Sequence, residues 1–164
     1  MKRILLILFT LLSNLQLSAQ GALTYQEPPE EIRQLVDAPL APRVRIDSKA
    51  ENIVLLYRNA YKTIAELSEE ELRLGGLRIN PKTNIGSRTT YYNDIKIKDA
   101  NARETKAISG LPASPRLANF RWSPNEEMMS FTHSTSTGVE VWVLDIADAT
   151  AKKVTGPKVN ANMR

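Results

Sequence analysis

The feature that most constrains this chain is an internal repeat. Residues 44–55 align without a gap on residues 120–131, at an offset of 76. In both runs an apolar-polar-apolar start, a polar turn and a second apolar segment coincide. A second pair, 94–99 and 140–145, matches at an offset of 46. Because a lone hairpin would not produce two such alignments, the two stretches are interpreted as copies of one unit.

Each copy predicts four short strands joined by turns. The expected strands are residues 44–46, 53–57, 95–98 and 105–108, then 120–122, 129–132, 140–144 and 152–155. The two offsets differ by 30, so the first copy carries about 30 extra residues between its second and third strands. Four-strand units at this spacing are typical of β-propeller blades, whereas a β-sandwich would explain the short strands but not the self-similarity. The predicted fold class is all-β, an incomplete β-propeller of about two blades with a short helical insertion.

The strand at 140–144 is apolar on both faces, since Trp142 and Leu144 alternate with valines. A strand of this kind must be covered on both sides, which in a propeller is done by the preceding and the following blade. Two blades cannot cover every face. The chain alone is therefore expected to aggregate or to stay partly molten.

The N-terminus has the layout of a secretory signal peptide. Lys2 and Arg3 precede the apolar run 4–12, and small residues follow. Cleavage is predicted after Ala19, with Gly21 as the second choice. A membrane anchor is the alternative, but the run is about half of the ~20 residues that a bilayer requires. With no cysteine to carry a lipid or a disulfide, the expected location is secreted or periplasmic, with no membrane contact after cleavage.

The predicted domain boundaries follow from these patterns. They are 1–19 (signal peptide), 25–43 (an N-terminal segment with a short helix), 44–108 (the first blade, with an insertion at 59–93), 120–155 (the second blade) and 156–164 (the truncated start of another blade). The net charge of +4 falls to +2 after cleavage, because residues 1–19 hold Lys2 and Arg3 and no acid. No face concentrates basic and aromatic residues, so nucleic acid is not an expected partner.

The insertion carries its own helix signal. Ser68 and Glu71 form an S-x-x-E capping box, and Gly75-Gly76 offers a left-handed exit, so a helix is predicted over 69–74. The acidic run 69–71 could be a metal or substrate site. The favoured interpretation is that acids in a first helical turn complement the helix dipole.

Candidate contact residues are few. Arg78, Lys82 and Arg88 surround a loop of the insertion and could meet an anionic ligand or partner, with solvated loop charge as the alternative. His133 is the only histidine, and a strand-end role is favoured over a base or a ligand. Trp122 and Trp142 could form a sugar platform, but their strand alternation favours core packing.

Several kinds of chemistry are missing from the sequence. It contains no G-x-S-x-G motif, no glycine-rich phosphate loop and no thiol, and one histidine cannot build a His/Cys metal site. No catalytic, cofactor-binding or metal-binding residue is predicted, and no cofactor is expected.

Four segments carry a family resemblance: PPEEIRQLVDAP, AELSEEELRLGGLRINPKTNIGSR, FRWSPNEEMMSFT and VEVWVLDI. They resemble the amino-terminal propeller region of serine peptidases of the prolyl oligopeptidase type, and the insertion is similar to the glutamyl endopeptidase branch. The resemblance covers the chain from about Tyr25 onward. The hairpin turn departs from the usual S-P-D-G, because Asn125-Glu126 stands in place of Asp-Gly.

The resemblance implies a secreted peptidase that hydrolyses peptides, with cleavage after Glu as one specificity. The chain would be the part of the propeller that gates access to a Ser-Asp-His catalytic domain, which this sequence does not contain. Its partners would be the remaining blades, that domain and, through it, the peptide substrate. The alternative is a non-enzymatic periplasmic propeller that serves as a binding or scaffolding module.

Overall fold

The computed structural model describes residues 26–162, which fall into two units that meet at Ala38–Pro39. The described part of the first unit holds one helix, α2 (Glu30–Val36), which begins after Pro29 and has two acids in its first turn. The short helix predicted in this segment is confirmed. Its apolar residues Ile32 and Leu35 are exposed. The predicted signal peptide lies outside the described residues.

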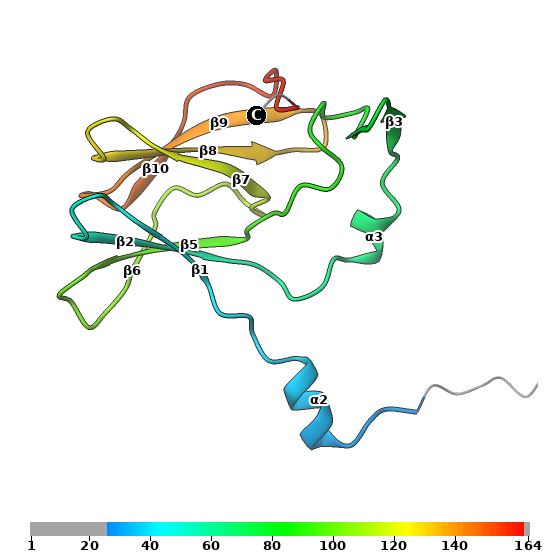
Figure 1. Ribbon diagram of the computed structural model, residues 1–164, viewed down its shortest axis with the longest axis horizontal. Coiled ribbons are helices and arrows are strands. Elements are labelled where there is room, and N and C mark those ends of the chain that lie inside the picture. Colours follow the sequence, from blue (N-terminus) through cyan, green and yellow to red (C-terminus); the bar gives the residue numbers. More distant parts are fainter. Residues whose placement is uncertain (1–25, 163–164) are drawn as a thin grey trace, which may run out of the picture. The chain divides into compact units, whose positions relative to one another are not determined.

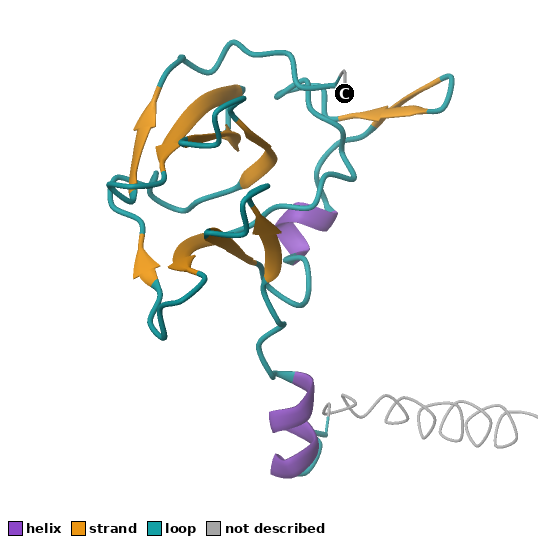
Figure 2. Ribbon diagram, turned by 60° about the vertical axis from the view of Figure 1, so that its left-hand side comes forward, coloured by secondary structure: helices purple, strands orange, loops and turns teal. Residues whose placement is uncertain are grey.

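The second unit is built from two four-stranded antiparallel sheets, each a meander (Figures 1 and 2). Sheet one comprises β1 (Arg43–Ile46), β2 (Asn52–Tyr57), β5 (Asp94–Asp99) and β6 (Lys106–Ala107). Sheet two comprises β7 (Leu117–Trp122), β8 (Met128–Ser134), β9 (Val139–Asp145) and β10 (Thr150–Lys153). Each predicted strand is therefore present, with shifts of a few residues at its ends, and the structure is mostly β as expected.

Equivalent residues pair in the two sheets. Ile46 pairs with Ile53 in sheet one, and their counterparts at the offset of 76, Trp122 and Met129, pair in sheet two. The same correspondence holds at the next two strand interfaces, where the equivalent pairs are Ile53–Lys98 and Met129–Leu144, then Lys96–Ala107 and Trp142–Lys153. The repeat found in the sequence is thus a repeat of strand register.

The first hairpin turn of each sheet repeats as well. Ala50 and Glu126 are equivalent, and both have a left-handed backbone, with φ of 55° and 59°. Their amides donate to the carbonyls of Asp47 and Ser123, which are also equivalent, at 3.2 and 3.0 Å. Equal turns fix equal registers, because turn geometry sets which residues face each other across a hairpin.

One local difference separates the two sheets. The β7–β8 register shifts between Ala118 and Arg121, and Asn119 in this stretch has φ of +54°. An extra residue in one strand is a β-bulge, which bends the strand and increases its twist. Sheet one has no register shift between β1 and β2. The bulge therefore changes the direction of the first strand in sheet two but not in sheet one.

The core lies between the sheets. Sheet one contributes Val54, Leu56, Ile95 and Ile97, and the buried residues on the other side include Met129, Phe131 and Leu144. A ladder of aromatic rings crosses the gap and sheet two, with neighbouring centroids 5.6 to 6.3 Å apart: Tyr92, Phe120, Phe131 and Trp142. Both tryptophans pack against this core, which confirms core packing as their role.

The two sheets bury opposite faces of the repeated unit. Leu56 is buried in sheet one, but its counterpart Thr132 lies on the outer face of sheet two. Conversely, Phe131 is buried, while its counterpart Leu55 lies on the outer face of sheet one. Successive residues of a strand point to opposite faces, so a fixed register identifies each face. The copies therefore pack head to tail, with unlike faces in contact.

The insertion between β2 and β5 differs from its predicted form. It contains a one-turn helix, α3 (Ile64–Leu67), and a hairpin of β3 (Leu72–Leu74) and β4 (Leu77–Ile79), which projects away from the sheets (Figure 2). The helix predicted over 69–74 is wrong. The capping box is formed by Thr63 with Glu66, and Gly75-Gly76, with φ of 52° and 95°, closes a two-residue hairpin turn.

Residues 156–162 follow sheet two and contain no strand. Ala161 forms an isolated parallel bridge with Ile85 of the insertion, and the amide of Val159 donates to the carbonyl of Val139 at 3.0 Å. The end of the described chain is thus attached to both the insertion and sheet two. The prediction that this segment starts another blade stays a prediction.

Candidate functional site

A cavity of about 440 Å³ lies where the first strands of the two sheets meet the end of the insertion. We call it the arginine cavity. Its basic lining residues are Arg43 and Arg45 from β1, Arg88 from the insertion and Arg121 from β7. No aspartate or glutamate lines it. An arginine-rich wall without acids is an unbalanced positive charge, the arrangement that guanidinium groups use to bind carboxylates or phosphates.

Strand alternation places two of these arginines on the packed side of sheet one. Arg43 pairs with Leu56 and Arg45 with Val54, and both partners are buried in the core. Because β1 is an edge strand, the long side chains can run along apolar surface and bring their charged ends to the rim. Arg43 Nη1 lies 3.5 Å from the Tyr92 hydroxyl. The Nε atom of Arg45 is buried and makes no hydrogen bond.

The three predicted contact residues are not brought together as one site. Arg78 Nη1 lies 2.6 Å from Glu71 Oε1, so this guanidinium is used inside the insertion. Arg88 lies 4.0 Å from Glu71 and is otherwise exposed. The hydroxyl of Ser87 and then Arg78 lower the pKa of Glu71 from 4.5 to about 2. Of the three, only Arg88 lines the arginine cavity, and Lys82 lines a different one.

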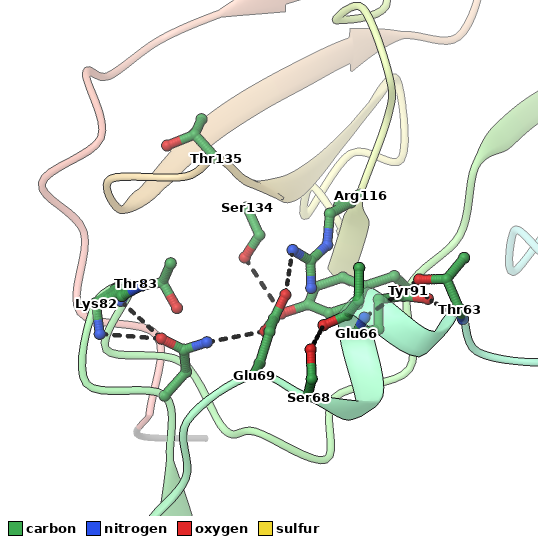
Figure 3. Close-up of polar contacts among 12 residues, drawn as sticks. Thr63, Glu66, Ser68, Glu69, Lys82, Thr83, Tyr91, Arg116, Ser134 and Thr135 are labelled. Atoms are coloured by element: carbon green, nitrogen blue, oxygen red, sulfur yellow. Dashed lines mark hydrogen bonds and ion pairs between the residues drawn. The ribbon is translucent and has the colours of Figure 1, made fainter.

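That second cavity, of about 240 Å³, lies between the insertion and the β8–β9 turn. Figure 3 shows its polar contacts. Glu69 accepts hydrogen bonds from Arg116 and from the side-chain amide of Asn80, both at 2.9 Å. The Arg116 guanidinium lies 4.4 Å from the centroid of the Tyr91 ring, and the Tyr91 hydroxyl is 3.3 Å from Ser134 Oγ. These contacts attach the insertion to sheet two, and burial raises the pKa of Tyr91.

The acidic run was expected to complement a helix dipole, and that interpretation is wrong. Glu69 and Glu71 lie outside α3 and bind Arg116 and Arg78. Within residues 26–162, no three acidic, histidine or cysteine side chains are grouped so that they could hold a metal ion. Glu71 pairs with arginines inside the insertion, and Glu69 pairs with Arg116 outside it.

His133 is buried within β8 and faces Glu140 on β9. Its Nδ1 lies 3.3 Å from Glu140 Oε2, which also accepts from Trp142 Nε1 at 2.9 Å. Lys153 approaches the second carboxylate oxygen at 3.4 Å. Burial alone would raise the pKa of Glu140, but these hydrogen bonds outweigh it and the pKa is lowered. The Glu140 carboxylate therefore has hydrogen-bond partners on both of its oxygens. The cluster holds His133 and Glu140 in fixed positions across β8 and β9.

Sequence reasoning missed Arg43, Arg45 and Arg121. A signal was present, because Arg45 and Arg121 occupy equivalent positions at the offset of 76 and both lie in the first strand of their sheet. A basic residue that recurs at one place in a repeat is more informative than a basic loop.

Within residues 26–162, no helix is both long enough and apolar enough to cross a bilayer.

Two curated plant proteins are similar to the chain. Over 138 residues, or 78% of this chain, it is 29% identical to a protein of Oryza sativa subsp. japonica named "Probable glutamyl endopeptidase, chloroplastic". Over 137 residues it is 30% identical to an Arabidopsis thaliana protein of the same name. The chain covers 15% and 14% of the lengths of these relatives. No family model matches the chain, and no solved structure gives a significant match. The likeness supports a peptidase-related family.

Proposed function

We propose that this chain is the amino-terminal part of a β-propeller in a secreted peptidase of the prolyl oligopeptidase type. Sheets one and two are two of its blades. The chain itself does no chemistry. It forms part of a ring that admits peptides to a hydrolase domain elsewhere in the longer protein and keeps folded proteins out.

The head-to-tail packing of the two sheets carries the proposal. A contact between unlike faces of one repeated unit leaves one face of each kind unused, and further copies can add at both ends until a ring closes. Both unused faces carry apolar residues. On sheet one, Val44 and Ile46 are 49% and 53% exposed, and on sheet two Val141 and Val143 are half-buried. Two sheets that packed through like faces would leave no such complementary pair of outer faces.

The peptidase assignment is supported by the plant relatives. The relatives are named as endopeptidases, and the likeness spans most of this chain but about a seventh of theirs. The buried His133 faces the Glu140 carboxylate through Nδ1 and packs edge-to-face against the Trp142 ring. Peptide hydrolysis is therefore assigned to another part of the longer protein.

The test is to express the protein from the whole gene and to measure its hydrolysis of short fluorogenic peptides, with and without Glu before the scissile bond, and of a folded protein substrate. We expect cleavage of the peptides, no cleavage of the folded protein, and no activity from residues 1–164 alone. A gene that encodes further blades and then stops, with an inactive product, would instead support the scaffolding propeller.

Export has a separate test. Amino-terminal sequencing of the protein recovered from the medium or the periplasm should give a chain that begins at Gln20, or at Ala22 if cleavage follows Gly21. Recovery of the intact amino terminus from the cytosol would contradict secretion and would leave the peptidase assignment untouched.

A further inference from the structure

We propose that the arginine cavity binds the side-chain carboxylates of an acidic peptide segment. The site is defined by residues of this chain alone. Its assignment to a peptide, as opposed to another carboxylate, rests on the proposed function.

The charge of the lining is the first argument. Four arginines and no acid line the cavity. Among the described residues, no ion pair includes Arg43, Arg45 or Arg121, and Arg88 Nε lies 4.0 Å from Glu71 Oε2. The arginines of the insertion hairpin, in contrast, are paired with Glu71. The cavity is thus a place where positive charge gathers without internal compensation, and it attracts anions.

Arg45 supplies the second argument. Its Nε atom is buried and has no hydrogen-bond partner. A buried donor of a charged group is costly to leave unpaired, and nearly all such donors in folded proteins have a partner. A carboxylate in the cavity is the partner that fits a guanidinium edge, because Nε and a terminal nitrogen can donate to its two oxygens together.

The walls favour an organic ligand over a free inorganic anion. Apolar and aromatic side chains share the lining with the arginines: Leu56, Tyr92 and Phe120. Hydroxyl and amide groups lie beside them on Thr89, Thr90 and Asn119. A ligand with an alkyl stem, a carboxylate and backbone polar groups matches all three kinds of surface. Glutamate and aspartate residues of an extended peptide have this composition, whereas phosphate has no apolar part.

The repeat supplies the last argument. Arg45 and Arg121 are equivalent residues, each on the first strand of its sheet. A guanidinium at this position therefore belongs to the repeated unit. The register places Arg45 opposite the buried Val54, on the packed face of sheet one, and Arg121 opposite Ser130, on the outer face of sheet two. In a ring built from such units, each gap between neighbouring sheets would therefore hold one guanidinium of this kind.

The test measures binding directly. A fluorescent peptide of alternating Glu and Ala is titrated with the protein, and the matched peptide has Gln in place of Glu. At low ionic strength we expect the Glu peptide to bind at least about tenfold more tightly, with most of that difference lost at about 0.15 M salt. Equal binding of the two peptides would overturn the proposal.

Variants locate the site. Arg45→Gln and Arg43→Gln should each weaken binding of the Glu peptide by about tenfold, as expected for one charge-assisted contact. Arg103→Gln is the matched control, because this exposed residue lies in the β5–β6 turn and does not line the cavity. Arg43 is exposed, so its variant keeps the test available if Arg45→Gln fails to fold. Equal loss in all three variants would show net-charge attraction and would overturn the site.

Competition identifies the ligand class. Inorganic phosphate should displace the peptide only at concentrations that also act through ionic strength. Displacement by phosphate at much lower concentrations would overturn the peptide assignment. The binding assay is independent of hydrolysis, so an inactive full-length protein that binds the Glu peptide would contradict the proposed function and leave this site standing.

Discussion

Sheets one and two have the same register and opposite surroundings. Leu55 and Phe131 are equivalent residues in equivalent strands, yet Phe131 is 1% exposed and Leu55 is half-buried on an outer face. Both positions carry apolar residues. The strand pattern therefore shows which faces of the unit can be buried, but not which of them is buried in this chain. Burial is decided by the neighbouring sheet. The unused apolar surface of sheet one is the part of the pattern that still requires a partner.

The two sheets also differ in how their second and third strands are joined. Sheet two uses a short turn closed by Thr135, whose amide and hydroxyl both bond to the Gly138 carbonyl. Sheet one uses the long insertion, and the pairing on either side of it is unchanged. Long loops add little entropic cost once their ends are fixed, so an insertion of this size is compatible with the same sheet.

The largest expected effect comes from truncating the two equivalent residues. Phe131→Ala should lower the free energy of unfolding by about 3–5 kcal/mol, since it empties a filled core position. Leu55→Ala should cost only about 1 kcal/mol, because the leucine lies on an outer face and part of its surface is already in water. Urea denaturation of residues 26–164, kept dilute enough to stay monomeric, measures both costs, and the absence of a cooperative transition would instead support the expectation that two sheets alone stay partly molten. Equal costs would contradict the head-to-tail arrangement.

The same pair tests the proposed ring in the protein expressed from the whole gene. If another blade covers the outer face of sheet one, the penalty of Leu55→Ala should rise there to about 2–5 kcal/mol, as for a buried leucine. An unchanged penalty in the full-length protein would mean that this face stays open and that no ring closes on it.

A second prediction concerns the connection between the sheets. The amide of Ser109 donates to the Ala149 carbonyl at 2.9 Å, and Gly110 follows with φ of 76°. A Cβ at Gly110 would lie 2.5 Å from the Ala151 carbonyl oxygen. Gly110→Ala should therefore cost about 1–3 kcal/mol from backbone strain and displacement. The control is Gly156→Ala, where a Cβ would meet nothing within 4 Å. Thermal unfolding of both variants measures the difference.

The strands could be predicted because two kinds of signal agreed. Alternation of apolar residues marks a strand, and the gapless match between copies fixes which strands are equivalent, so an error in one copy is corrected by the other. The insertion has no second copy. Its residues offered two capping boxes, at Thr63 and at Ser68, and a Gly-Gly pair that suits either a helix exit or a hairpin turn.

The site was harder to predict than the fold. Three basic residues of one loop were grouped because they are close in sequence, but Arg78 is neutralised by Glu71 and only Arg88 reaches the arginine cavity. The cavity is formed by β1, β7 and the end of the insertion, segments that are far apart in the chain. Sequence cannot show which acid each arginine meets, and that is what separates a structural ion pair from a binding group.

A smaller effect is expected from acid in the insertion. The pKa of Glu71 is lowered from 4.5 to about 2 by Ser87 and Arg78, so the folded protein holds this proton less tightly than the unfolded chain. Its stabilising contribution is complete above pH 4.5 and is lost as the pH falls through about 2. Glu71→Gln should remove that part of the acid dependence of the melting temperature. Glu70→Gln, at an exposed neighbour, should leave it unchanged.

The smallest effect separates the two equivalent turns. Ala50 and Glu126 both have left-handed backbones, and glycine relieves the strain of such a residue by about 1 kcal/mol, part of which is offset by the entropy of the unfolded chain. Ala50→Gly should therefore stabilise the protein by about 0.5 kcal/mol. Glu126→Gly should not, since Glu126 Oε2 accepts from the amide and the hydroxyl of Ser48, at 2.9 and 2.6 Å, and ties one turn to the other. If chemical denaturation showed both variants equally stabilised, the Ser48–Glu126 contact would have no role in holding the sheets together. The association of the two sheets would then have to come from the packing of their unlike faces alone.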